Sequence, residues 1–218
     1  GVKISLHDDR DNDNGSQTFH YEGGIREYVE YLNEGKDVIN DEPIFISDEE
    51  EGPDGVVDVE IAIQVTGAMQ SSVVSFANNI NTAEGGKHLT GFKSALTRLY
   101  NDYAQENALM QDLDENLTGE DVRDGMTSVI SIKHPDPQFE GQTKTSLGNA
   151  EVRGVVETTV REGIETFFEE NPDLAEKLVT NAVEAAKARQ AAEKAKEVTR
   201  RKTALESTRL PGKLADCQ

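Results

Sequence analysis

The chain has 218 residues, and its 42 aspartates and glutamates outnumber its 22 lysines and arginines to give a net charge of −20. Hydrophobic residues make up 35% of the chain and tryptophan is absent, so a lean core is expected in one large domain or two small ones. So acidic a body argues against a strong non-specific grip on nucleic acid, which needs clustered lysine and arginine.

The first quarter of the chain predicts a hairpin and a helix. Apolar and polar residues alternate at 2–7 and 17–21 on either side of a polar turn at 8–16, which is typical of a β-hairpin. Apolar residues with helical spacing follow at 25–32, and the polar residues and glycine at 33–35 end that helix.

Three strands are expected next. Residues 43–46 form a short apolar strand, and residues 56–66 alternate strictly between apolar and polar side chains. Residues 71–77 also alternate, and the turn at 67–70 predicts that they pair with 56–66.

The middle of the chain mixes helix, strand and loop. Gly85-Gly86 opens a helix that runs to about residue 103 with its apolar residues on one face. A polar connection at 111–125 includes a capped turn at 118–121. A strand at 126–133 leads into an extended loop, 135–147, that contains two prolines.

The last part of the chain is helical. One helix is predicted over 152–170, and Asn171-Pro172-Asp173 starts a second that runs to about residue 203. Large apolar residues become rare after Val183, so the far half of this helix is expected to project from the core or to pack only lightly on it. Six or seven strands and four helices in all predict an α+β layered fold.

Charge and cysteine content bear on location. The net charge is −14 over 1–60, −9 over 61–171 and +3 over 172–218, so only the last segment is suited to lie near DNA. The acidity fits either a salt-rich cytoplasm or an ordinary acidic protein. Cys217 is the only cysteine, no membrane span or signal peptide is visible, and a reducing, cytoplasmic compartment is expected.

Two ligand motifs come close to a template and miss it. Gly86 and Gly91 have the spacing of a phosphate loop, but Phe92 stands where the loop lysine is required. The three aspartates between residues 9 and 13 resemble the start of a calcium loop, but Asn14 replaces the required glycine and His20 the required glutamate. A helix start and an acidic hairpin tip are the better interpretations.

The histidines give no metal-ligand pattern. None of the four, His7, His20, His88 and His134, has a cysteine or another histidine at a ligand spacing, so no metal site is predicted. His7 and His20 fall on paired strands and could be neighbours, although packing on the strand face is the better default.

The loop at 135–147 is harder to dismiss. Lys144 is its only charged donor, and Gln142 stands two residues earlier, so both side chains would point the same way from an extended segment. Such a pair could reach a phosphate held by another domain. An ordinary solvated surface loop is the alternative that composition favours.

Eight runs of sequence, taken together, resemble the B subunits of type IIA DNA topoisomerases. They are residues 21–25, 31–33, 75–89, 91–93, 120–125, 135–144, 199–202 and 210–217. The runs follow the order of that family over nearly the whole chain. Two closely similar kinds of B subunit in this family share several of these runs. The run at 75–82 resembles one kind more than the other.

The resemblance implies a particular part of such a protein. Residues 1–170 would be its transducer domain, an α+β fold like domain 2 of ribosomal protein S5, with a mixed sheet and a left-handed βαβ crossover. Residues 171–218 would be a long C-terminal helix and a linker toward a metal-binding TOPRIM domain. Motifs of the GHKL ATP pocket and of TOPRIM are not seen, so this segment alone is expected neither to hydrolyse ATP nor to cut DNA.

The resemblance also implies roles for residues. Lys144 would contact the terminal phosphate of ATP in the adjacent domain, and Gln142 would assist it, with ATP and Mg²⁺ bound mainly outside this segment. Lys93 would line a cavity that holds the transported duplex. A basic group would lie near the DNA gate: Lys194, Lys196, Arg200, Arg201 and Lys202. The partners would be a second copy of the same protein, the other polypeptide of the enzyme, known as the A protein, and double-stranded DNA.

Alternatives remain for each expectation. Lys93 and the basic group could be solvated positions on helix faces, with ion pairs four residues apart along the last helix. The whole chain could be a stand-alone acidic interaction module that uses the same fold without ATP. A relative among the mismatch-repair or chaperone ATPases is a third possibility, but such a relative should lack the Asn78-Asn79 and 210–217 runs.

Overall fold

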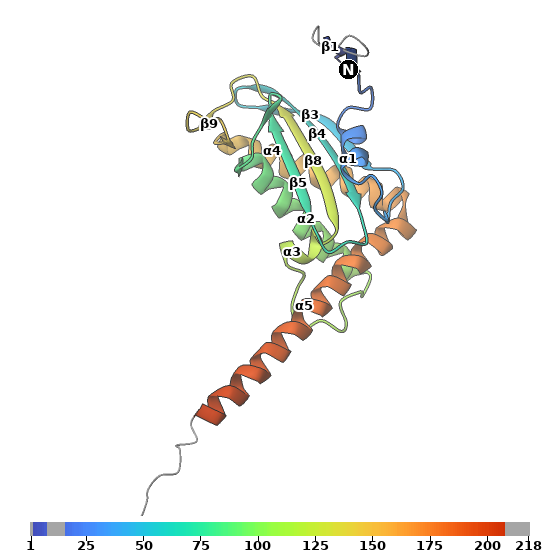
Figure 1. The fold of residues 1–218 in the computed structure, drawn as a ribbon, viewed down its shortest axis with the longest axis vertical. Helices are drawn as coiled ribbons and strands as arrows, with labels where there is room; N and C mark the ends of the chain where they lie inside the picture. Colours follow the sequence, from blue (N-terminus) through green and yellow to red (C-terminus); the bar gives the residue numbers. More distant parts are fainter. Residues whose placement is uncertain (1, 8–15, 208–218) are drawn as a thin grey trace, which may run out of the picture.

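The computed structural model describes residues 2–7 and 16–207, the last six of them by their backbone alone. Within these residues the chain forms ten strands and five helices around a five-stranded sheet of order β3-β4-β8-β5-β6 (Figure 1). The strands of this sheet are β3 (Ile44–Gly52), β4 (Gly55–Val65), β5 (Ser72–Ala77), β6 (Ile80–Asn81) and β8 (Met126–Lys133). The mixed α/β layering agrees with the fold class expected from the sequence.

The partner of β5 differs from the sequence prediction. β8 lies between β4 and β5, antiparallel to β4 through Ile61 and Ile130 and parallel to β5 through Ser75 and Ile130. The chain therefore leaves β5, forms helices, and returns as β8 beside it. Alternation at 71–77 identifies a strand but does not say which strand it pairs with, and the short turn after β4 wrongly suggested a hairpin.

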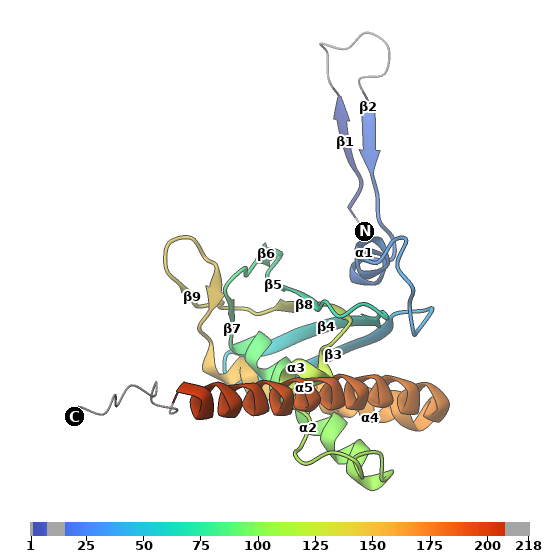
Figure 2. The same cartoon turned by 60° about the horizontal axis from the view of Figure 1, so that its bottom comes forward.

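Helices cover both faces of the sheet (Figure 2). α2 (Lys87–Glu106) and α4 (Ala150–Glu170) lie on one face, where they enclose the larger core with the alternate residues of β4 from Val57 to Val65. α1 (Ile25–Leu32) lies on the other face, where Val29 packs with Ala62 and Val129. The strict alternation in β4 thus supplies both cores, as a sheet with two covered faces requires.

The glycines of the near-miss phosphate loop serve close packing. A Cβ on Gly86, whose φ is 136°, would lie 2.5 Å from the backbone nitrogen of Leu147. A Cβ on Gly91 would lie 2.5 Å from the carbonyl oxygen of Arg153, where α2 and α4 touch. Glycine lets the backbones approach at both points, which supports the interpretation of this stretch as a helix start.

The last helix, α5 (Pro172–Ser207), is held at one end and free at the other. Its buried residues run from Ala175 to Gln190, and every residue from 191 to 201 is exposed. Figure 1 shows the second half extending away from the body of the molecule. The projection expected from the loss of apolar residues is therefore confirmed. No helix in the described part of the chain is long and apolar enough to cross a membrane.

The N-terminal hairpin stands apart from the sheet (Figure 2). β1 (Ile4–His7) pairs antiparallel with β2 (Ser16–Phe19), as predicted, and His7 lies opposite Ser16. His20 follows the other end of β2, so the two histidines are not neighbours. The acidic tip with the calcium-like aspartates lies outside the described residues.

Candidate functional site

The segment predicted as an extended loop forms a small hairpin instead. β9 (Phe139–Glu140) and β10 (Ser146–Leu147) pair antiparallel, and β10 also pairs in parallel with β7 (Gly85–Gly86), just before α2. The backbone N–H of Glu84 donates to the carbonyl of Thr145 at 2.9 Å, which extends this attachment. The sequence showed the prolines and the polar residues, but two-residue strands are too short to give an alternation signal.

The tip of this hairpin presents the two residues singled out in the sequence. Gln142 and Lys144 are both exposed, and Lys144 adopts a left-handed backbone with φ 54°. The rule that residues two apart share a direction therefore does not apply here, because the segment is a turn and not a strand. The ammonium of Lys144 lies 5.8 Å from the centre of the Phe139 ring. Left-handed geometry is uncommon for a lysine and costs of order 1–3 kcal/mol, and strained residues of this kind cluster at functional sites as well as in turns.

Lys93 lies near a second cation. It sits on α2, where burial and the charge of Arg123 lower the pKa of its ammonium group. Arg123 follows the short helix α3 (Gly119–Val122), and burial lowers its pKa as well, against the charge of Glu120. A like charge this close disfavours the charged form of the lysine. Arg123 is absent from the sequence-based candidates, since the spacing of 30 residues carries no signal.

The basic group of α5 is only partly paired. Lys194 Nζ lies 2.5 Å from Asp114 Oδ2, and Arg201 Nη2 lies 2.5 Å from Glu197 Oε1. The remaining members are Lys196 and Arg200, which are exposed, and Lys202, whose side chain lies outside the described part. The i,i+4 pair at Glu197 is of the kind weighed as the alternative to a DNA-proximal role.

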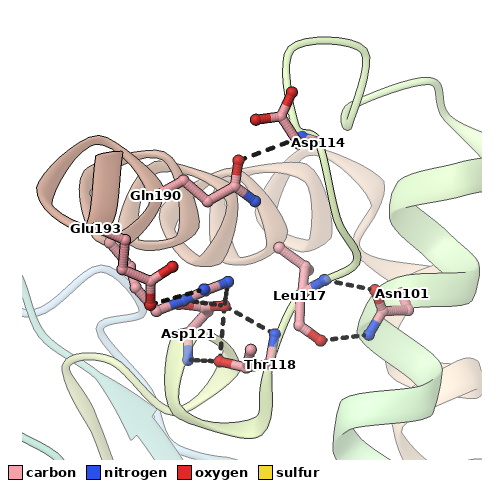
Figure 3. Close-up of polar contacts among 8 residues, drawn as sticks. Asn101, Asp114, Leu117, Thr118, Asp121, Gln190 and Glu193 are labelled. Carbon is pink, nitrogen blue, oxygen red and sulfur yellow. Dashed lines mark hydrogen bonds and ion pairs between the residues drawn. The ribbon is translucent and has the colours of Figure 1, made fainter. Parts of the chain in front are cut away.

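α5 is joined to the body through a buried carboxylate (Figure 3). Thr118 is the N-cap of α3, and Asp121 completes its capping box by accepting from the backbone and hydroxyl of Thr118. Asp121 also accepts from Nε and Nη2 of Arg189 on α5 at 2.9 and 3.0 Å. Burial alone would raise the pKa of Asp121, but these donors outweigh it and hold the pKa below its usual range. The capped turn was predictable, whereas its partner 68 residues away was not.

One group of metal-ligand type occurs in the described residues. Oxygen and nitrogen atoms of Asp54, His134 and Glu151 lie within 4.8 Å of one another. However, His134 Nδ1 accepts from the backbone N–H of Asp136 at 3.1 Å, so the neutral ring carries its proton on Nε2, which faces Glu151 at 3.2 Å. The lone pair of Nδ1 is then already engaged and Nε2 bears the proton, so the group fits a hydrogen-bonded cluster better than a metal site.

Comparison with known proteins gives relatives over the whole chain. It is 63% identical over 219 residues to the DNA gyrase B protein of Haloferax volcanii and 54% identical over 217 residues to that of Enterococcus faecalis. All of this chain is covered in both cases. It spans about a third (33%) of each relative's length.

Solved structures agree. The 43K ATPase domain of Thermus thermophilus gyrase B matches with a TM-score of 0.76 and 35% identity, covering 90% of this chain and 51% of that one. The topoisomerase IV ATP-binding domain of Francisella tularensis matches at 0.68 and 26%, covering 86% and 49%. The run at 75–82 favoured gyrase over topoisomerase IV, and the curated relatives at 63% and 54% identity are gyrase B proteins. The model of the DNA gyrase B family matches residues 24–198, and the chain therefore belongs to the DNA gyrase B family.

Proposed function

We propose that this chain is the transducer segment of a DNA gyrase B protein. It would couple ATP binding and hydrolysis in an adjacent domain to closure of a dimeric clamp and passage of a DNA duplex. The observation that carries the proposal is the small hairpin that presents Gln142 and Lys144, exposed and with a strained backbone at the lysine. The division into 1–170 and 171–218, the S5-like fold and its left-handed crossover belong to the same proposal.

The chemistry follows from the charge of the lysine. A gyrase B protein holds ATP with Mg²⁺, and negative charge builds up on the transferring phosphoryl group. Lys144 contributes a point charge there and Gln142 a hydrogen-bond donor, which stabilises the transition state. Loss of the terminal phosphate removes the attraction and releases the hairpin. The bound nucleotide thereby determines the position of this domain relative to the ATP-binding domain.

Exposed apolar residues on the N-terminal hairpin support the proposal that another domain contacts this segment. Val2, Ile4 and Leu6 are 79%, 60% and 60% exposed, and Tyr21 and Tyr31 are exposed nearby. Apolar surface of this kind is typical of a contact face. A second copy of gyrase B, the gyrase A protein and double-stranded DNA complete the proposed assembly. Lys93 and the basic group of α5 would face the DNA, and the segment alone would not hydrolyse ATP.

The test is Lys144→Ala in a full-length gyrase B protein. This segment replaces the matching 219 residues of the Haloferax volcanii protein, which is assembled with its gyrase A partner. We expect kcat for ATP hydrolysis to fall by about 10²–10³-fold, because a transition-state charge is lost, while nucleotide binding falls much less. Lys177→Ala, an exposed lysine on α5, is the control and should change neither. Unchanged turnover in Lys144→Ala would refute the proposal.

A further inference from the structure

We infer that Asn149 is a positioning residue that sets the place of the Gln142 and Lys144 hairpin relative to the core. The inference rests on the proposed function of that hairpin. Both ends of the hairpin meet at Asn149: the chain enters through Gln138 and leaves through Gly148, whose N–H donates to the carbonyl of Gln138 at 2.7 Å. Asn149 is 5% exposed and stands directly before α4.

The side chain of Asn149 serves the hairpin and not the helix. Asparagine at this position normally accepts a hydrogen bond from the first turn of the helix, but no such bond forms here. Its Oδ1 instead accepts from the backbone N–H of Gln138 at 2.6 Å, across the base of the hairpin. The side chain therefore stabilises the entry of the chain into the hairpin and not the first turn of α4.

The amide group of Asn149 is itself held. Nδ2 donates to Glu151 Oε1 at 2.6 Å, and the same oxygen lies 3.2 Å from His134 Nε2. The His134 side chain is 1% exposed, and its Nδ1 accepts from Asp136 at the start of the hairpin segment. The Glu151 backbone N–H and these donors hold the pKa of the Glu151 carboxyl below its usual range, so it stays an acceptor near neutral pH.

The cluster connects the hairpin to the rigid sheet. Asn78, in the turn after β5, accepts from the N–H of His134 at 2.8 Å and donates to its carbonyl at 2.9 Å. His134 follows β8 and Glu151 lies in the first turn of α4. The end of β5, the end of β8 and the start of α4 therefore all contribute to the cluster that holds Asn149. Lys144 is five residues from this anchor. A displacement of about 1 Å at a positioned group can cost on the order of 10²-fold in rate.

The first experiment is a double-mutant comparison in the same full-length chimeric protein. We expect Asn149→Ala to lower kcat for ATP hydrolysis by about 10- to 100-fold with KM for ATP little changed. In a Lys144→Ala background the same substitution should cost no further activity, because it acts through the lysine. An additional loss of the same size in that background would show a general structural role and overturn the inference.

A polarity exchange separates positioning from folding. Asn149→Asp keeps the acceptor for Gln138 but places a carboxylate against Glu151, and it should lower kcat. Adding Glu151→Gln restores a donor toward the new carboxylate and leaves an oxygen for His134, so kcat should recover. Failure to recover, with melting temperatures matched, would overturn the inference. If Asn149→Ala is fully active while Lys144→Ala is inactive, the inference about Asn149 is refuted and the proposed function stands. If Lys144→Ala is active, the proposed function itself is refuted.

Discussion

At His88, a ring nitrogen is buried without a partner. The residue lies in the first turn of α2 and is fully buried, with Nε2 3.1 Å from Thr82 Oγ1. Thr82 donates its hydroxyl proton to the carbonyl of Ser75 at 3.0 Å, so it accepts from Nε2–H, and Nδ1 carries the lone pair. Protonation would add a buried charge and an N–H without an acceptor, so burial lowers the pKa of His88 to about 4.

This shift predicts a loss of stability in mild acid. Above pH 6.5, the ordinary pKa, His88 is neutral in both states and costs nothing. As pH falls from 6.5 to about 4, the unfolded chain takes up a proton that the folded chain refuses, so the free energy of unfolding should drop by about 3 kcal/mol. Urea midpoints across this range measure it. His88→Gln keeps a donor for Thr82 without titrating, and an equally steep profile in that variant would contradict the assignment.

At the scale of elements, the buried pair between α3 and α5 should matter more than its exposed neighbour. Asp121→Ala removes one half of the capping box of α3 and leaves the Arg189 guanidinium with only the exposed Glu193 carboxylate, 3.5 Å away, so we expect the free energy of unfolding to fall by about 2–4 kcal/mol. Denaturant unfolding followed by circular dichroism gives the value. Asp112→Ala is the matched control, since its pair with Lys187, also from α5 at 3.0 Å, is exposed and worth under about 1 kcal/mol. Equal losses would contradict the prediction.

The sequence predicted elements better than their partners. α1, α2 and α4 agree with prediction to within a few residues, because each has an apolar stripe that depends only on near neighbours. The pairing of β5 with β8 depends on which strand reaches the free edge of β4, and nothing within residues 71–77 records that. Register and pairing are properties of the assembled sheet, so local alternation leaves them open.

In the candidate site, too, the sequence predicted the residues but not the contacts that position them. Lys144 stood out as the only charged donor of a loop that begins with two prolines, with Gln142 two residues earlier, and because the loop resembles a known family. The hairpin that presents them was missed, since its strands have two residues each. The contact of Asn149 with Gln138 was also missed, because an asparagine before a helix predicts a cap and the competing acceptance from the loop is a tertiary event.

At the scale of the whole molecule, the net charge of −20 brings acidic side chains together on the sheet. On the sheet, Glu49 of β3 lies directly opposite Asp58 of β4, with Glu60 beside them. Lys133 of β8 bonds Asp58 at 3.0 Å, and that hydrogen bond, together with the charges of all three carboxylates, raises its pKa. Like charges opposite one another destabilise a strand pair, so the fold carries repulsion that dissolved ions can screen.

Salt should therefore stabilise this chain. Raising KCl from about 0.1 to about 1 M shortens the screening length from about 10 to about 3 Å, and we expect the melting temperature to rise by several degrees. Sucrose in place of salt controls for exclusion effects. Lys133→Gln removes the cation that offsets Glu49 and Asp58, so it should lose more stability at low salt than at high salt. A melting temperature indifferent to KCl would mean that the net charge of −20 is already dispersed enough for water to screen.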